Sequence, residues 1–186
     1  MSARYDTHML HIVLVEGDIT EQQVDAIVDA TNSSLMGGAG VSAAIHQRGG
    51  PTILEECKKL RQTDYPDGLP TGKAVATTAG DLPARWVIHT AGPAYSSTED
   101  RSELLASCHT ESLKVADEIG AKTVAFPAIS TGVYGYPLEL AAPVAIRAVR
   151  EAETDVEEVR FVLFGLAAYE AFERALRPGE PTTPSE

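Results

Sequence analysis

The segment "AISTGVYGYP", Ala128–Pro137, combines hydroxyl residues and glycines directly after an apolar run. Gly132 and Gly135 permit positive φ angles and close approach of a ligand to the backbone, while Ser130 and Thr131 add hydroxyl donors beside several N–H groups. These groups suit an oxyanion cradle that needs no lysine. The segment lacks the GxxxxGKS/T pattern, which argues against a nucleoside triphosphate with bound Mg²⁺. The alternative interpretation is a tight connection that uses glycine only to turn.

A second glycine-rich segment, "NSSLMGGAGVSAAIH", starts at Asn32 after another apolar run. Its glycines Gly37, Gly38 and Gly40 let a ligand approach the backbone. A helix that begins near Val41 would direct its positive N-terminal dipole toward any group above it. Together, two such loops after separate strands can clamp both phosphates of a pyrophosphate.

The composition limits the classes to which the chain can belong. With 186 residues, 44% apolar and 23% charged, it suits one compact domain. A net charge of −12 argues against a nucleic-acid-binding face, because phosphate backbones are met by clustered lysine and arginine. No stretch approaches the ~18 apolar residues of a membrane span, and a cytoplasmic protein is expected. Cys57 and Cys108 show no CxxC or metal-ligand spacing, which favours reduced core thiols.

Apolar runs alternate with amphipathic segments, which predicts strands alternating with helices. Strands are expected within residues 10–15, 26–31, 72–80, 85–93, 123–129 and 159–165. Helices are expected as two pieces within 41–60, interrupted at Gly49-Gly50-Pro51, and within 100–121, 138–153 and 167–176. This order implies an α/β fold with a mixed, largely parallel sheet and helices on both faces.

In such a sheet, a ligand binds beyond the carboxyl ends of the strands. Four loops of specific composition follow strands and are expected to converge on one crevice: Gly17-Asp18-Ile19, the segment from Asn32, the segment from Ala128, and Phe164-Gly165. No internal repeat or second core is evident, so residues 1–177 are expected to form a single domain. The polar, proline-rich tail, residues 178–186, is expected to be disordered.

Four ordered motifs make the chain similar to a known family. "GDIT", "VDAIVDATNSSLMGGAGVSAAIHQRGG", "TGKAVATTAGDLPARWVIHTAGP" and "PAISTGVYGYP" resemble the macrodomain family of ADP-ribose-binding modules, particularly its bacterial and mitochondrial hydrolase branch. The resemblance covers about residues 8–176. It implies a three-layer α/β/α macrodomain.

The resemblance also implies a role for each motif residue. Asp18 would accept a hydrogen bond from the adenine amino group, with the Ile19 N–H close by, and Phe164 would offer an aromatic face to the base. Asn32 would contact the terminal ribose. The residues that would line that ribose and the neighbouring phosphate are Gly38, Gly40 and Val41, and those that would wrap the diphosphate and the distal ribose are Ser130, Thr131, Gly132, Val133 and Tyr134.

One position departs from the hydrolase branch. There, the glycine cluster is usually followed by Val-Asp, and that aspartate orients or activates the attacking water; here the position is Ser42. A serine hydroxyl is not a general base near neutral pH without a base of its own. His46, at i,i+4 from Ser42, matches another position that the branch uses near the terminal ribose. Asn32, Ser42 and His46 are therefore the expected catalytic residues.

The leading hypothesis is an enzyme that binds ADP-ribose and hydrolyses its esters, on a protein carboxylate or in O-acetyl-ADP-ribose. Attack by a water held between Asn32, the phosphate oxygens of the ligand and the Ser42/His46 face would be substrate-assisted. The expected partners are ADP-ribose or an ADP-ribosylated protein, without metal, cofactor, membrane or nucleic acid, and the chain is expected to be a monomer. The alternatives are a non-catalytic ADP-ribose reader and removal of ADP-ribose from nucleic acid.

Several of these residues also have a purely structural interpretation. His46 can be a satisfied, partly buried histidine, and Ser42 can simply fill space in an inactive site. Tyr134 can serve in packing. His89, which alternates along a strand, is interpreted as structural.

Overall fold

The computed structural model describes residues 10–177, which contain six strands and five α-helices. The strands are β1 (His11–Glu16), β2 (Ala26–Thr31), β3 (Ala74–Thr78), β4 (Trp86–Ala91), β5 (Thr123–Phe126) and β6 (Glu158–Leu163). The helices are α1 (Val41–Gly49), α2 (Pro51–Gln62), α3 (Ser102–Ile119), α4 (Leu138–Glu151) and α5 (Leu166–Leu176), and a 3₁₀ turn covers Ile19–Glu21.

All six strands form one sheet in the order β1-β6-β5-β2-β4-β3. Every neighbouring pair is parallel except β3 with β4, which is antiparallel. The sheet is thus mixed and largely parallel, as the sequence predicts. The inner strands β2 and β5 are mostly apolar and are buried on both faces, which is typical of a parallel sheet covered by helices.

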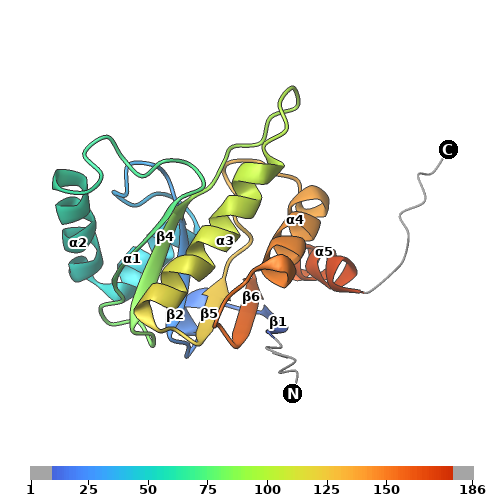
Figure 1. Cartoon of the computed structure of the whole chain (residues 1–186), viewed down its shortest axis with the longest axis horizontal. Helices are drawn as coiled ribbons and strands as arrows, with labels where there is room; N and C mark the ends of the chain where they lie inside the picture. Colours follow the sequence, from blue (N-terminus) through green and yellow to red (C-terminus); the bar gives the residue numbers. More distant parts are fainter. Residues whose placement is uncertain (1–9, 178–186) are drawn as a thin grey trace, which may run out of the picture.

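Helices cover both faces of the sheet and make three layers (Figure 1). One hydrophobic cluster joins the sheet to α3, α4 and α5 and includes the packed rings of Phe126, Phe161 and Phe172. A second cluster joins the other face to α1 and α2 through Ile45 and Ile53. The expected three-layer α/β/α fold is confirmed.

The two central strands β2 and β5 are adjacent, but the helices that follow them lie on opposite faces. The chain leaves β2 for α1, which packs into the cluster with α2, and leaves β5 for α4, which packs with α3 and α5. Such a reversal opens a crevice between the two loops beyond the carboxyl ends of the strands. The segments that begin at Asn32 and Ala128 are these two loops.

The predicted element boundaries hold closely in two informative places. The helical segment from Val41 divides at Gly50, whose φ of 82° no α-helical residue adopts, and Pro51 then starts α2 as its first residue. The stop of α3 is Gly120, in a left-handed conformation with φ 75°. The tail of residues 178–186 lies outside the described residues.

Candidate functional site

A cavity of about 250 Å³ lies between the β2–α1 loop and the β5–α4 loop. Both loops contribute short side chains and backbone to its wall. The expected site residues that line it are Asn32, Gly38, Gly40, Val41, Ser42, Ser130, Gly132, Val133 and Tyr134. The structure therefore gathers most of the predicted ligand-binding set, from two loops about a hundred residues apart in the chain, at one place.

Helix α1 presents its N-terminus to this cavity. Gly40 is the N-cap, with φ 63°, and no side chain caps the first turn. The first backbone N–H groups of a helix have no acceptor within the helix, and the helix dipole makes them favourable partners for an anion. This end of the cavity can bind a phosphate group without a basic side chain.

The β5–α4 loop holds Ser130 in an unusual conformation. Ser130 has φ 68°, which is uncommon for a residue other than glycine, and its buried hydroxyl has no hydrogen-bond partner among the described residues. The buried Thr31 hydroxyl, also at the cavity wall, is likewise unpartnered within residues 10–177. Because unpaired buried hydroxyls cost free energy, both are suited to bonding a polar ligand.

Gly92 makes room for the Ser130 conformation. A Cβ at Gly92 would lie 2.5 Å from the Ser130 Oγ, so only glycine fits this position without displacing the serine. Sequence reasoning did not select Gly92, although it follows strand β4 directly in "HTAGP". Its neighbourhood shows that three strand ends, not two, shape the cavity.

Thr131 and Gly132 differ from their expected roles in detail. The Thr131 hydroxyl donates to the Ala128 carbonyl at 2.8 Å and closes the turn, and the residue is absent from the cavity wall. Gly132 does not need a positive φ; that conformation falls on Ser130 and Gly135. Gly132 instead provides open space, since a Cβ there would meet no atom within 4 Å.

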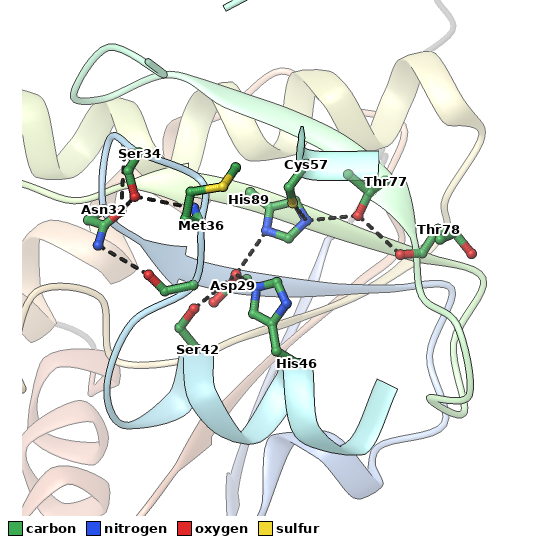
Figure 2. A network of polar contacts seen from close by, with 11 residues as sticks. Asp29, Asn32, Ser34, Met36, Ser42, His46, Cys57, Thr77, Thr78 and His89 are labelled. Carbon is green, nitrogen blue, oxygen red and sulfur yellow. Dashed lines mark hydrogen bonds and ion pairs between the residues drawn. The ribbon is translucent and has the colours of Figure 1, made fainter. Parts of the chain in front are cut away.

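The side chain of Asn32 is held in one orientation (Figure 2). Its Oδ1 accepts hydrogen bonds from the backbone N–H and the hydroxyl of Ser34, and its Nδ2 donates to the Gly37 carbonyl at 3.2 Å. One amide hydrogen remains for a ligand. A preoriented amide of this kind can bind a ribose hydroxyl or a water molecule without losing side-chain freedom.

Asp18, Ile19 and Phe164 lie outside the cavity, beyond the ends of the adjacent strands β1 and β6. The Gly17 N–H donates to the Leu163 carbonyl, which brings the two strand ends together. Phe164 is 89% exposed although it is aromatic, which suits a stacking surface. The hydrogen bond from the Thr20 hydroxyl, opposed by burial and helped by the Thr20 N–H and Arg48, holds the pKa of Asp18 below its usual value.

Behind the cavity lies a buried carboxylate that the sequence reasoning missed. Asp29, in the middle of β2, is fully buried, and its Oδ2 is 3.3 Å from the Ser42 Oγ and 2.8 Å from the His89 Nδ1 (Figure 2). The only signal in the sequence is a charged residue at the centre of the apolar run "AIVDAT". A buried charge needs a partner, and none of the local motifs identifies it.

His89 supplies that partner as an imidazolium ion. The Thr77 hydroxyl donates to the Thr78 carbonyl, so its oxygen accepts from the His89 Nε2 at 2.8 Å, while the His89 Nδ1 donates to Asp29. Both ring nitrogens then carry hydrogen. Burial alone would lower the pKa of His89, but the hydrogen bond and charge of Asp29 and the contact with Cys57 raise it to about 9. His89 is thus structural, as predicted, and charged.

His46 faces the same carboxylate from α1 but does not line the cavity. Its Nε2 lies 3.9 Å from the Asp29 Oδ2, neither ring nitrogen has a hydrogen-bond partner among the described residues, and its ring borders a separate hollow beside Met36 and Gly37. Burial lowers the pKa of His46, with Asp29 opposing this effect and His89 adding to it. The i,i+4 argument correctly places Ser42 and His46 on one helix face, which is the face toward Asp29.

Asp29, His46 and His89 are the only three described metal-ligating side chains that approach one another closely, with ligand atoms within 4.8 Å. A metal there would have to displace the proton that His89 Nδ1 shares with Asp29. The hydrogen-bond pattern favours a closed ion pair over a metal site. Within residues 10–177, no helix is long and apolar enough to cross a membrane.

The crevice lies where the strand order reverses, and its wall holds the N-terminus of α1 and two hydroxyls that are unpaired among the described residues. These features define a class: doubly wound α/β domains with a binding site for a phosphate-bearing ligand. The macro domain family matches this chain over residues 28–145. A macro domain-containing protein of Streptomyces nogalater is 65% identical over 168 residues, which cover 90% of this chain and 93% of that protein. One of Streptomyces coelicolor is 65% identical over 88% of this chain and 97% of its own length. The chain belongs to the macro domain family.

Solved structures of this family share the fold. The Oceanobacillus iheyensis macrodomain with ADP has a TM-score of 0.84 and 40% sequence identity over 88% of each chain. The Trypanosoma brucei macrodomain in complex with ADP-ribose has a TM-score of 0.79 and 35% identity over 90% of this chain and 69% of that chain. The recognised family and the three-layer fold are therefore both confirmed.

The raised pKa of His89 predicts a loss of stability at alkaline pH. The folded protein holds the His89 proton up to about pH 9, whereas an unfolded histidine releases it near pH 6.5. The contribution of the ion pair is fully present below pH 6.5 and is lost as the pH rises through about 9. Urea unfolding at a series of pH values should show the unfolding free energy falling across this window.

The matched variant is His89→Gln, which should flatten this dependence, with exposed His11→Gln as the control for removal of a histidine. NMR titration of the His89 ring in the folded protein gives the same pKa without unfolding. A His89 ring that titrates near pH 6.5 would contradict the imidazolium assignment.

Proposed function

We propose that this chain binds ADP-ribose across the crevice and hydrolyses ADP-ribose esters. The observation that carries the proposal is the cavity between two strand-end loops, with a helix N-terminus and unpaired hydroxyls in its wall. The family supports the same ligand, because the Oceanobacillus iheyensis and Trypanosoma brucei structures are described with ADP and with ADP-ribose.

In the proposed complex, the ligand runs from the β1 and β6 ends toward β2. Asp18 receives the adenine amino group through its Oδ2, because Oδ1 is already occupied by Thr20, and Phe164 covers the face of the base. The Ile19 N–H lies beside the ring. The diphosphate then passes between the N-terminus of α1 and the Ser130–Tyr134 turn, where backbone N–H groups meet it.

The terminal ribose reaches Asn32, whose fixed amide bonds one of its hydroxyls. A water molecule between Asn32, a phosphate oxygen and Ser42 attacks the acyl or the anomeric carbon of the ester, and a phosphate oxygen assists its deprotonation. The products are ADP-ribose and the free carboxylic acid of the acceptor. His46 acts at most from behind the cavity wall, because it does not line the cavity.

A second function is favoured by one observation. The cavity wall of the described chain contains no acidic or basic side chain, so a general base is missing from direct contact with the ligand. A reader that binds ADP-ribose without turnover accounts for this wall equally well. Removal of ADP-ribose from nucleic acid is less favoured, because the chain carries a net charge of −12.

Replacement of the adenine-binding carboxylate tests the orientation of the ligand. Asp18→Ala should weaken ADP-ribose binding by roughly 1.5–3 kcal/mol, the usual cost of losing a charged hydrogen bond. Isothermal titration calorimetry measures the change. Glu21→Ala is the control, since this exposed carboxylate also lies near Arg48. Equal affinity in the parent and a folded Asp18→Ala protein would refute the adenine assignment.

The open space at Gly132 allows a steric and electrostatic test. Gly132→Glu should abolish ADP-ribose binding, because it puts bulk and negative charge where the phosphates are expected, while no neighbouring atom prevents the protein from folding. Leu140→Glu adds the same charge at a half-exposed position on α4 and should leave binding unchanged. Normal binding by the Gly132→Glu protein would show that the loop is only a turn.

Hydrolysis is tested with glutamate-linked ADP-ribosylated protein and with O-acetyl-ADP-ribose. The parent should release ADP-ribose from at least one of them, and Asn32→Ala should slow the release by more than about tenfold, or 1.4 kcal/mol in the barrier. Ser33→Ala, a neighbour outside the cavity wall, is the control. Tight binding without release from either substrate would favour the reader.

A further inference from the structure

The Ser42 hydroxyl has one proton to donate, and the structure shows which group accepts it. The residue is 2% exposed, lies in the cavity wall on the first turn of α1, and places its Oγ 3.3 Å from the Asp29 Oδ2. In this hydrogen bond the Ser42 hydroxyl is the donor and the Asp29 carboxylate oxygen is the acceptor. Its oxygen therefore has lone pairs, and no proton, for a group in the cavity.

Two histidines and the Ser42 hydroxyl face the Asp29 carboxylate. The Nδ1 of His89 on β4 donates to the same Oδ2, and the Nε2 of that ring donates to Thr77 on β3. Cys57 on α2 contacts the ring, and His46 on α1 is the other titratable group facing the carboxylate. The Asp29 and His89 charges cancel, so this pair places no net charge behind the diphosphate site.

We infer that Asp29 is a positioning residue that acts through Ser42, fixing the serine oxygen as an uncharged hydrogen-bond acceptor for the attacking water. This inference rests on the proposed hydrolysis. It replaces the idea that the site has no carboxylate: the carboxylate lies one side chain behind the wall, on β2 instead of α1. The water donates one hydrogen to the Ser42 oxygen, and this hydrogen bond directs a lone pair of the water toward the ester.

The position of Asp29 also explains why position 42 is not acidic here. A carboxylate at position 42 would lie beside the Asp29 carboxylate in a buried site, and two like charges that close cannot both remain ionised without a large cost. Serine at 42 and aspartate at 29 are therefore one combination. Changing both residues together, so that the carboxylate moves from position 29 to position 42, should preserve the function of the pair, whereas changing either residue alone should not.

The test is a double-mutant cycle on single-turnover ADP-ribose release, with ADP-ribose affinity measured by calorimetry on each protein. Ser42→Ala and Asp29→Asn should each slow release by roughly tenfold and leave the affinity within about threefold, because the effect falls on the reacting water. The double variant should be little slower than either single one, since the two residues act as a unit. A double variant slowed by the product of the two single effects would contradict the inference.

A second pair of variants tests the combination. Ser42→Asp alone should release ADP-ribose more slowly than the parent protein, whereas Ser42→Asp combined with Asp29→Asn should regain at least about a third of the parent rate. Ser33→Ala, at an exposed position outside the cavity wall, is the control and should leave the rate unchanged. Failure of the exchanged pair to recover activity, with the fold confirmed by circular dichroism, would overturn the inference.

The two levels of the proposal fail differently. A parent protein that binds ADP-ribose but releases none from either ester refutes hydrolysis, and the positioning role with it. A parent protein that hydrolyses the ester, but whose rate is unchanged by Asp29→Asn, refutes only the role of Asp29. Should Asp29→Asn fail to fold, Ser42→Ala and Ser42→Thr still test whether the hydroxyl is needed for release. Neither variant replaces a residue of the ion pair, and only the threonine keeps a hydroxyl.

Discussion

The site follows from one constraint: after the adjacent strands β2 and β5, the chain leaves for opposite faces of the sheet. Two adjacent parallel strands end at the same edge of the sheet, and their chains leave for helices on opposite faces. The loops must separate there, and the cavity is the space between them. The N-terminus of α1 and the Thr31 and Ser130 hydroxyls, which are unpaired in the described structure, lie at its wall, so an acidic chain can offer a site for an anionic ligand.

The charged side chains near this site lie behind the cavity wall and not in it. The wall of the cavity presents neutral and mostly small side chains, while the carboxylate of Asp29 and the imidazolium of His89 are paired behind it. Compared with a well-packed apolar pair, a buried ion pair adds little net stability, because desolvation offsets much of the attraction; losing one of its charges is costly, because the other charge is left buried and unpaired. Its value here is geometric: it fixes the Ser42 hydroxyl and connects α1, β2 and β4.

An uncommon backbone conformation in the β5–α4 loop and a glycine after β4 together leave a hydroxyl available to a ligand. Ser130 occupies a positive φ with its hydroxyl unpaired in the described structure, and the absence of a side chain at Gly92 is what permits it. The Thr131 hydroxyl, by contrast, donates to the Ala128 carbonyl and closes the turn. Neighbouring residues of similar chemistry therefore divide into one that is free for a ligand and one that is structural.

The sequence by itself determined the α/β fold, the strand and helix order, the glycine stops and the membership of the macro domain family, because these depend on local apolar patterns and on contiguous motifs. It also located most of the cavity wall. Only the tertiary structure decided the positions and contacts of Asp29, His46 and Thr131. Asp29 is 13 residues from Ser42 and 60 from His89 along the chain, and no local pattern encodes which strands lie side by side or which way a buried side chain turns. Sheet order and packing set those distances, and the proton of Ser42 follows them.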